Sequence, residues 1–184
     1  MNIYDLLPQF KVLEINKMVA LHNAHNIAQV PTKVSTRPAG ERKFVENGYV
    51  FYLESVDGEL QLVTPSAAES RQNPFLIYTE ELFDGYSDEL RHYATEFDED
   101  GEKAYVRGLA LYVGDVFTTN NVNAVATGLY YLADDGSFTN DAASDGTGDT
   151  INTGTYEGPV FHGLASTLPD GDTDAVELTL VRFQ

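Results

Sequence analysis

The last two-fifths of the chain decides the fold. It reads GLALYVGDVFTTN at Gly108–Asn120, GLYYLADDGSFTN at Gly128–Asn140 and GPVFHGLASTLPDGDTDAVELTLVRF at Gly158–Phe183. Short apolar and aromatic runs, which favour extended structure, alternate here with turns rich in Asp, Gly and Asn. Two turns, Ala133–Ser137 and Leu168–Asp174, contain Asp-Gly, a strong signal for a tight reversal between strands. This pattern predicts an all-β unit of antiparallel strands.

The stretch before it also favours strands. Residues 49–55 and 60–64 flank Asp57-Gly58, which predicts a β-hairpin. A second hairpin is predicted between Glu89–Phe97 and Glu102–Val113. Asn140–Tyr156 is poor in apolar residues and is expected to be a long surface loop. The 184-residue chain is therefore predicted to be mainly β, a small barrel or sandwich of short antiparallel strands.

The N-terminal segment has a different pattern. Apolar residues at helical spacing after a possible N-cap predict a helix around Asn16–Ala28, while Phe10–Ile15 is also compatible with a short strand. Gln29–Lys43 contains two prolines and several basic residues, which favours an extended arm. We therefore divide the chain into residues 1–43, a short helical segment with a basic arm, and residues 44–184, an acidic β-rich body. The barrel-like part of that body spans about residues 108–184.

Charge divides the chain at the same place. Residues 1–43 hold six basic and three acidic side chains, a net +3, whereas residues 44–184 hold five basic and 26 acidic ones, a net −21. An acidic body repels nucleic acid and anionic membranes, so neither is expected as a partner. The arm is expected to contact the acidic surface of a protein partner through its basic residues Lys33, Arg37, Arg42 and Lys43. An acidic surface that serves solubility alone is the alternative interpretation.

No sequence pattern predicts catalysis. The chain has no cysteine, so thiolate chemistry and Cys-ligated zinc are excluded. His22 and His25 have no third ligand near them, and the acidic turn Asp98–Glu102 lacks the spacing of a calcium loop. Neither a G-x-S-x-G elbow nor a phosphate-binding glycine loop occurs. We expect no catalytic site, no metal and no cofactor, and a soluble protein without a membrane span.

The C-terminal motifs resemble the small β-barrel of tailed-bacteriophage capsid decoration (cement) proteins. The matching elements are an apolar strand after Gly114-Asp115, an aromatic strand with an Asp-Asp-Gly turn and a hydroxyl-rich strand, a Gly-apolar strand, a Gly-Asp-Thr turn and a Val/Leu-rich closing strand. They fall at Gly114-Asp115, Tyr130–Thr139, Gly163-Leu164-Ala165, Gly171-Asp172-Thr173 and Val176–Phe183, over about 75 residues. In this chain, Asn140–Tyr156 takes the place of the family's short connection.

The resemblance implies a non-enzymatic virion protein that binds the outside of a capsid and stabilises it. Its partner would be the major capsid protein, with self-association, as in a trimer, also implied. The protein would be soluble in the host cytoplasm before assembly and would then lie on the capsid exterior. The alternative from another class is a receptor- or carbohydrate-binding β module of a virion fibre or adhesin, with exposed tyrosines such as Tyr86 or Tyr156 in its loops.

Overall fold

The structure of the chain is a computed structural model. It describes the backbone of the strands at 12–19, 26–33, 90–92 and 94–96, and it describes residues 44–65, 68, 72–78, 104–140, 158–168 and 174–183. In these segments the regular structure is β, which confirms the predicted mainly β class. Within the same segments, no helix is long and apolar enough to cross a membrane.

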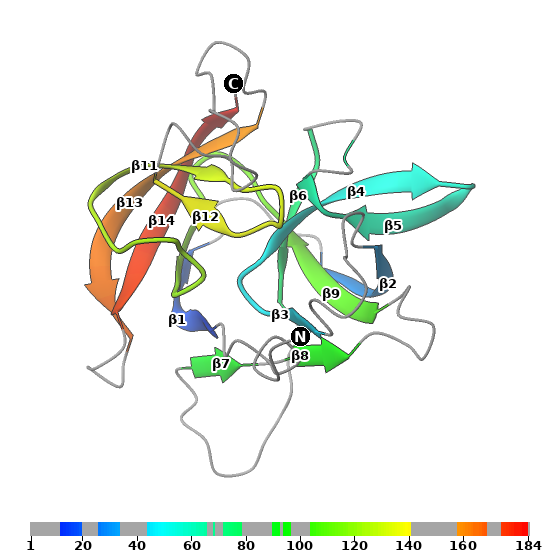
Figure 1. Cartoon of the computed structure of the whole chain (residues 1–184), viewed down its shortest axis with the longest axis horizontal. Coiled ribbons are helices and arrows are strands. Elements are labelled where there is room, and N and C mark those ends of the chain that lie inside the picture. Colours follow the sequence, from blue (N-terminus) through cyan, green and yellow to red (C-terminus); the bar gives the residue numbers. More distant parts are fainter. Residues whose placement is uncertain are drawn as a thin grey trace, which may run out of the picture.

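The larger sheet holds seven antiparallel strands and lies mainly on the left in Figure 1. Its strand order is β12-β11-β13-β14-β10-β1-β7. The strand bounds are β1 Val12–Val19, β7 Leu90–His92, β10 Val116–Thr119, β11 Gly128–Leu132, β12 Phe138–Thr139, β13 Pro159–Thr167 and β14 Asp174–Phe183. The long hairpin of β13 and β14 is its centre, paired from Pro159↔Phe183 to Thr167↔Asp174. The turn predicted at Leu168–Asp174 lies outside the described residues except for Leu168 and Asp174.

Side-chain alternation gives this sheet a core face and an outer face. On β14, Val176, Leu178 and Leu180 are fully buried, and the residues between them are directed to the opposite face. On β13, Phe161 is buried with that core, whereas His162 and Leu164 are exposed on the outer face. The outer face of β13 is therefore open to solvent at His162 and Leu164, whereas Val160 at its start is fully buried beside Tyr131.

The second sheet closes into a five-stranded barrel, on the right in Figure 1. Its order is β2-β5-β4-β6-β9, and its strands pair antiparallel except for β2 and β5, which are parallel. The bounds are β2 Asn26–Lys33, β4 Val50–Val56, β5 Glu59–Val63, β6 Pro74–Ile77 and β9 Ala104–Ala110. A short two-stranded sheet joins β3 (Phe44–Glu46) to β8 (Ala94–Glu96).

Side chains fill the barrel. One buried cluster comprises Val45, Tyr49, Phe51, Leu62, Phe75, Ile77 and Val106. Space is tight enough that a Cβ added at Gly108 would lie 3.2 Å from the Phe75 Cβ. The interior is thus a packed core, as expected for a barrel with few strands.

The barrel and the seven-stranded sheet share a second core. Val50, Tyr52, Val63 and Leu76 come from the barrel, and Phe117, Tyr130, Phe138, Phe161, Val176, Leu178 and Leu180 come from the sheet. Phe138 and Phe161 meet edge to face with ring centroids 5.1 Å apart. Because β4 alternates between the two cores, it is buried on both faces along its first half.

Hydrogen bonds reinforce this junction. The fully buried Asn121 donates from Nδ2 to the Gly48 carbonyl oxygen at 3.0 Å. The Val50 amide donates to the Gly136 carbonyl oxygen at 2.9 Å. Gly136 lies in the Asp134-Asp135-Gly136 turn with φ +87°, so the predicted reversal at Ala133–Ser137 is confirmed and also contacts the barrel.

The predicted hairpin at Asp57-Gly58 is confirmed. Asp57 and Gly58 have φ values of +52° and +85° between β4 and β5. Positive φ at both central positions is the geometry of the Asp-Gly hairpin turn.

Three predictions of local structure were wrong. The helix expected around Asn16–Ala28 is not formed at its ends, where β1 pairs with β10 and β7, and β2 pairs with β9 and β5. The start of the expected extended arm, Gln29–Lys33, belongs to barrel strand β2. Pairing with strands far along the chain outweighs the weak helical spacing, because local propensity is a small term beside sheet formation.

The prediction of a second hairpin was also wrong. Strand β8, within Glu89–Phe97, pairs with β3, and β9 pairs with β2 and β6 instead. The long loop expected at Asn140–Tyr156 lies outside the described residues except for Asn140.

Candidate functional site

Two segments of the larger sheet contain no charged side chain. Val116–Ala133 and Gly158–Leu168 together hold 29 residues without Asp, Glu, Lys or Arg, although these types make up 22% of the chain. The first segment contains β10 and β11, and the second contains β13. Because β11 pairs with β13, most of this uncharged sequence is gathered on one side of an acidic protein.

The register places four exposed residues of these segments together. Leu129 faces His162 across the β11–β13 ladder, and Gly128 faces Gly163. Continuing this ladder by one residue brings Thr127 opposite Leu164, and the Ala165 amide does donate to Thr127 Oγ1 at 3.3 Å. Val125 precedes them in the loop. We call Val125, Thr127, Leu129, His162 and Leu164 the neutral face.

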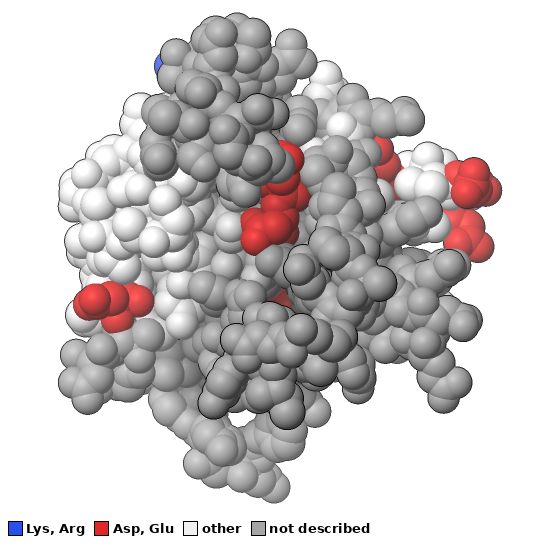
Figure 2. Space-filling model, viewed as in Figure 1, with Lys and Arg blue, Asp and Glu red and all other residues white. Residues whose placement is uncertain are grey.

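The neutral face is apolar as well as uncharged. Val125 is 37% exposed, Leu129 43% and Leu164 45%. Figure 2 shows the left-hand part of the molecule, which holds β11, β13 and the loop before β11, as a white surface with acidic side chains at its margins. On β14, the half-buried Glu177 pairs with Leu164 and forms part of the border.

The loop that carries Val125 is held in place by hydrogen bonds. The Tyr130 hydroxyl accepts from the Ala126 amide at 3.0 Å and lies 2.9 Å from the carbonyl oxygens of Ala124 and Ala126, to either of which it can donate. The Asn123 amide donates to the Phe138 carbonyl oxygen at 2.9 Å. Asn123 Oδ1 accepts from the Asn140 amide at 3.1 Å. The exposed loop is therefore preorganised.

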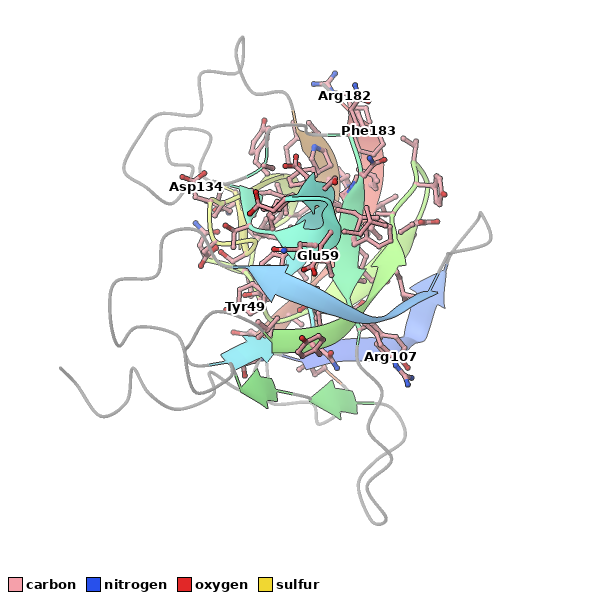
Figure 3. The ribbon with its side chains drawn as sticks, turned by 90° about the vertical axis from the view of Figure 1, so that its right-hand side faces the viewer. Tyr49, Glu59, Arg107, Asp134, Arg182 and Phe183 are labelled. Atoms are coloured by element: carbon pink, nitrogen blue, oxygen red, sulfur yellow. The ribbon has the colours of Figure 1, made fainter. Side chains whose placement is uncertain are left out.

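A second exposed apolar group lies at the end of β14. Tyr112 and Val113 form a turn whose next residue, Gly114, donates its amide to the Leu180 carbonyl oxygen at 2.7 Å. Val181 and Phe183 follow, and they are 40% and 41% exposed. This group includes the charged Arg182, which lies beside Phe183 in Figure 3, so it differs from the neutral face.

The four predicted contact residues are only partly within the described structure. Lys33 is the last residue of β2, and its backbone pairs with Val63 of β5. Arg37, Arg42 and Lys43 lie outside the described residues. The structure therefore brings Lys33 to one end of the barrel and gives no position for the other three.

Acidic and histidine side chains form no metal-binding group of three or more within the described segments. The Asp135 carboxylate accepts hydrogen bonds from both the amide and the hydroxyl of Ser137, so it stabilises its own turn. Asp115 Oδ2 likewise accepts from the Tyr112 amide at 2.8 Å. These carboxylates have local structural partners.

Sequence reasoning missed the neutral face. The signal was present as two charge-free runs, but charge was counted over long segments and not along the strands. Comparisons of the chain with protein families, with curated proteins and with solved structures found no match. The surfaces described here are therefore the basis for assigning a function.

Proposed function

We propose that this protein is a non-enzymatic structural component of a virion, which binds the outer surface of a bacteriophage capsid and stabilises it. The observation that carries the proposal is the set of basic residues at the end of barrel strand β2 and just after it, Lys33, Arg37, Arg42 and Lys43, in a chain whose formal net charge is −18. The basic part would engage an acidic region of the major capsid protein while the acidic body faces solvent. The resemblance of Gly114–Phe183 to decoration proteins supports the same role.

The position of Lys33 supports an anchored contact. β2 is held between β9 and β5, so the chain leaves the barrel at a defined point next to Val63. The residues that follow include Arg37, Arg42 and Lys43. A basic segment tethered to a folded strand retains fewer alternative positions than a free tail, which lowers the entropy cost of docking.

The packed barrel is also in keeping with a structural role. Its interior is occupied by side chains such as Phe51, Phe75 and Val106. Small-molecule sites are usually hollow and apolar with a few convergent polar groups, which the filled barrel does not offer.

The experiment uses the full-length chain, since removing residues 1–43 would also remove barrel strand β2. Four substitutions, Lys33→Gln, Arg37→Gln, Arg42→Gln and Lys43→Gln, are combined, and binding to empty shells that lack this protein is measured over a salt series. The control combines Arg71→Gln, Arg91→Gln, Lys103→Gln and Arg182→Gln, which changes the net charge equally. We expect saturable binding that weakens with salt, a loss of affinity in the first variant, and nearly normal binding in the control.

Equal binding by the two variants would reject the basic contact while leaving attachment intact. Failure of the folded wild-type protein to attach would reject the decoration role. In that case a glycan array would test the alternative of a receptor- or carbohydrate-binding module.

A further inference from the structure

We propose that the neutral face is a self-association surface, on which a second copy of this chain docks. The proposal concerns the free protein and does not depend on capsid binding. It rests on the charge, exposure and rigidity of Val125, Thr127, Leu129, His162 and Leu164, each of which was described above.

The net charge of the chain indicates which partner docks on the neutral face. Each copy carries a formal net charge of −18, so two copies repel one another over most of their surfaces. Juxtaposed like charges at an interface are strongly unfavourable. Contact through segments without Asp, Glu, Lys or Arg avoids that cost, and Leu129 and Leu164 lie within such segments. The neutral face therefore suits a partner that is itself acidic, and a second copy is such a partner.

Apolar exposure supplies the driving force. The side chains of Val125, Leu129 and Leu164 are 37%, 43% and 45% exposed, and removing this area from water favours association. Homodimer interfaces are more apolar than other protein surface and are depleted in charge at their centres. The neutral face has both properties.

Rigidity lowers the cost of docking. The Tyr130 hydroxyl fixes the backbone at Ala124 and Ala126, and Thr127 is bonded to Ala165 of β13. A surface already ordered in the free protein loses little conformational entropy on binding. In a two-fold contact the same face of each copy forms the interface, so each neutral face would pack against the neutral face of the other copy.

The mass of the wild-type protein in solution is measured by light scattering and sedimentation over a concentration series. The test variant combines Leu129→Asp and Leu164→Asp on the outer face of the sheet. The control is Leu60→Asp, because Leu60 is 62% exposed at the tip of the β4–β5 hairpin, away from the neutral face. We expect a concentration-dependent oligomer for the wild-type protein and L60D, and association weaker by about tenfold or more for L129D/L164D.

Salt gives an independent prediction. Added salt of about 0.5 M screens the repulsion between acidic bodies, so association through the neutral face should strengthen. Val125→Lys provides a second test in the loop, should the double variant lose its fold by circular dichroism. V125K should also weaken association.

Three results would overturn the proposal. The first is a wild-type protein that stays monomeric at all concentrations and salt levels. The second is an oligomer that L60D disrupts and L129D/L164D and V125K do not. The third is a monomer that attaches to shells and loses attachment in L129D/L164D, which would assign the neutral face to the shell. Because mass in solution and shell attachment are separate readouts, failure here is distinguishable from failure of the decoration role.

Discussion

Gly163 lies directly against the ring of Tyr130. A Cβ added at Gly163 would be 2.4 Å from Tyr130 Cε2 and 2.8 Å from Val176 Cγ1, well inside van der Waals contact. The glycine therefore lets the tyrosine ring cross β13, so that the Tyr130 hydroxyl reaches the loop at Ala124 and Ala126. One residue without a side chain thus permits the arrangement that holds the neutral face in place.

Gly163→Ala should destabilise the protein by about 1–3 kcal/mol, because overpacking forces the ring or the strand to move. Urea denaturation followed by circular dichroism measures the change. Thr167→Ala, at an exposed position of the same strand, should stay within about 0.5 kcal/mol of the wild-type stability. Equal stabilities of G163A and T167A would show that the ring does not occupy this position.

Tyr130→Phe removes the hydroxyl and leaves the ring. We expect the free energy of unfolding to fall by about 1–3 kcal/mol, because the Ala126 amide and the carbonyl oxygens of Ala124 and Ala126 lose a hydrogen-bond partner. Hydrogen exchange at the Ala126 amide should become faster, which a general loss of stability alone would not confine to this loop. Tyr105→Phe is the control, since Tyr105 is 55% exposed on β9. Unchanged exchange at Ala126 in Y130F would contradict the role of the hydroxyl.

Asn121→Asp should destabilise the junction between the two sheets more than Asn121→Ala does. The substitution replaces the donor to Gly48 with an acceptor and buries a carboxylate at a position that is fully buried. Burial disfavours the charged form, so the pKa of the introduced carboxyl is raised in the folded state.

A raised folded-state pKa gives stability that is lost as the pH rises. The loss of folding stability in N121D relative to wild type should therefore be larger at about pH 8 than at about pH 5. At the lower pH the protonated carboxyl can donate a hydrogen bond to the Gly48 oxygen. Thermal denaturation at the two pH values measures it. A deficit that is the same at both, or smaller at high pH, would show that position 121 is open to water.

Gly58→Ala and Gly136→Ala form a matched pair. Both glycines have φ near +86°, with Gly58 at +85° and Gly136 at +87°. Nothing lies within 4 Å of a Cβ at Gly58, whereas a Cβ at Gly136 would be 2.7 Å from both Phe51 Cε1 and the Val50 oxygen. G58A should cost about 1–2 kcal/mol from backbone strain alone. G136A should cost about 1–3 kcal/mol more because of the added clash. Equal losses on chemical denaturation would mean that the turn can move away from the barrel.

The sequence was most informative where the signal was local. The Asp57-Gly58 turn could be predicted because two adjacent residues tolerate positive φ, and strand β14 could be predicted from its run of Val and Leu. The strands at Val12–Val19 and Asn26–Lys33 could not be found in this way, because their partners, such as Val116 and Tyr105, lie about 75–100 residues away. Neither apolar spacing nor propensity encodes such a partner.

The neutral face could be predicted only in part from the sequence. The charge-free runs at Val116–Ala133 and Gly158–Leu168 are visible in the sequence. The exposure of Leu129 and Leu164 is not, because a shift of one residue along a strand would bury them and expose Tyr130 and Phe161 instead. Only the register with β13 and β14 decides which residues face solvent.

The position of β1 has a consequence for synthesis. Its pairing partners, β7 and β10, begin at Leu90 and Val116, so Val12–Val19 has no partner strand in this sheet until about half of the chain has been made. At ribosomal rates, about 100 residues take roughly 5–20 s, far longer than a strand needs to find a partner that is already present. During that interval the nascent strand presents unpaired backbone groups to other chains. When many copies of this protein are translated at the same time, mispairing of strand β1 between chains is therefore favoured. A chaperone that binds extended segments would suppress this mispairing.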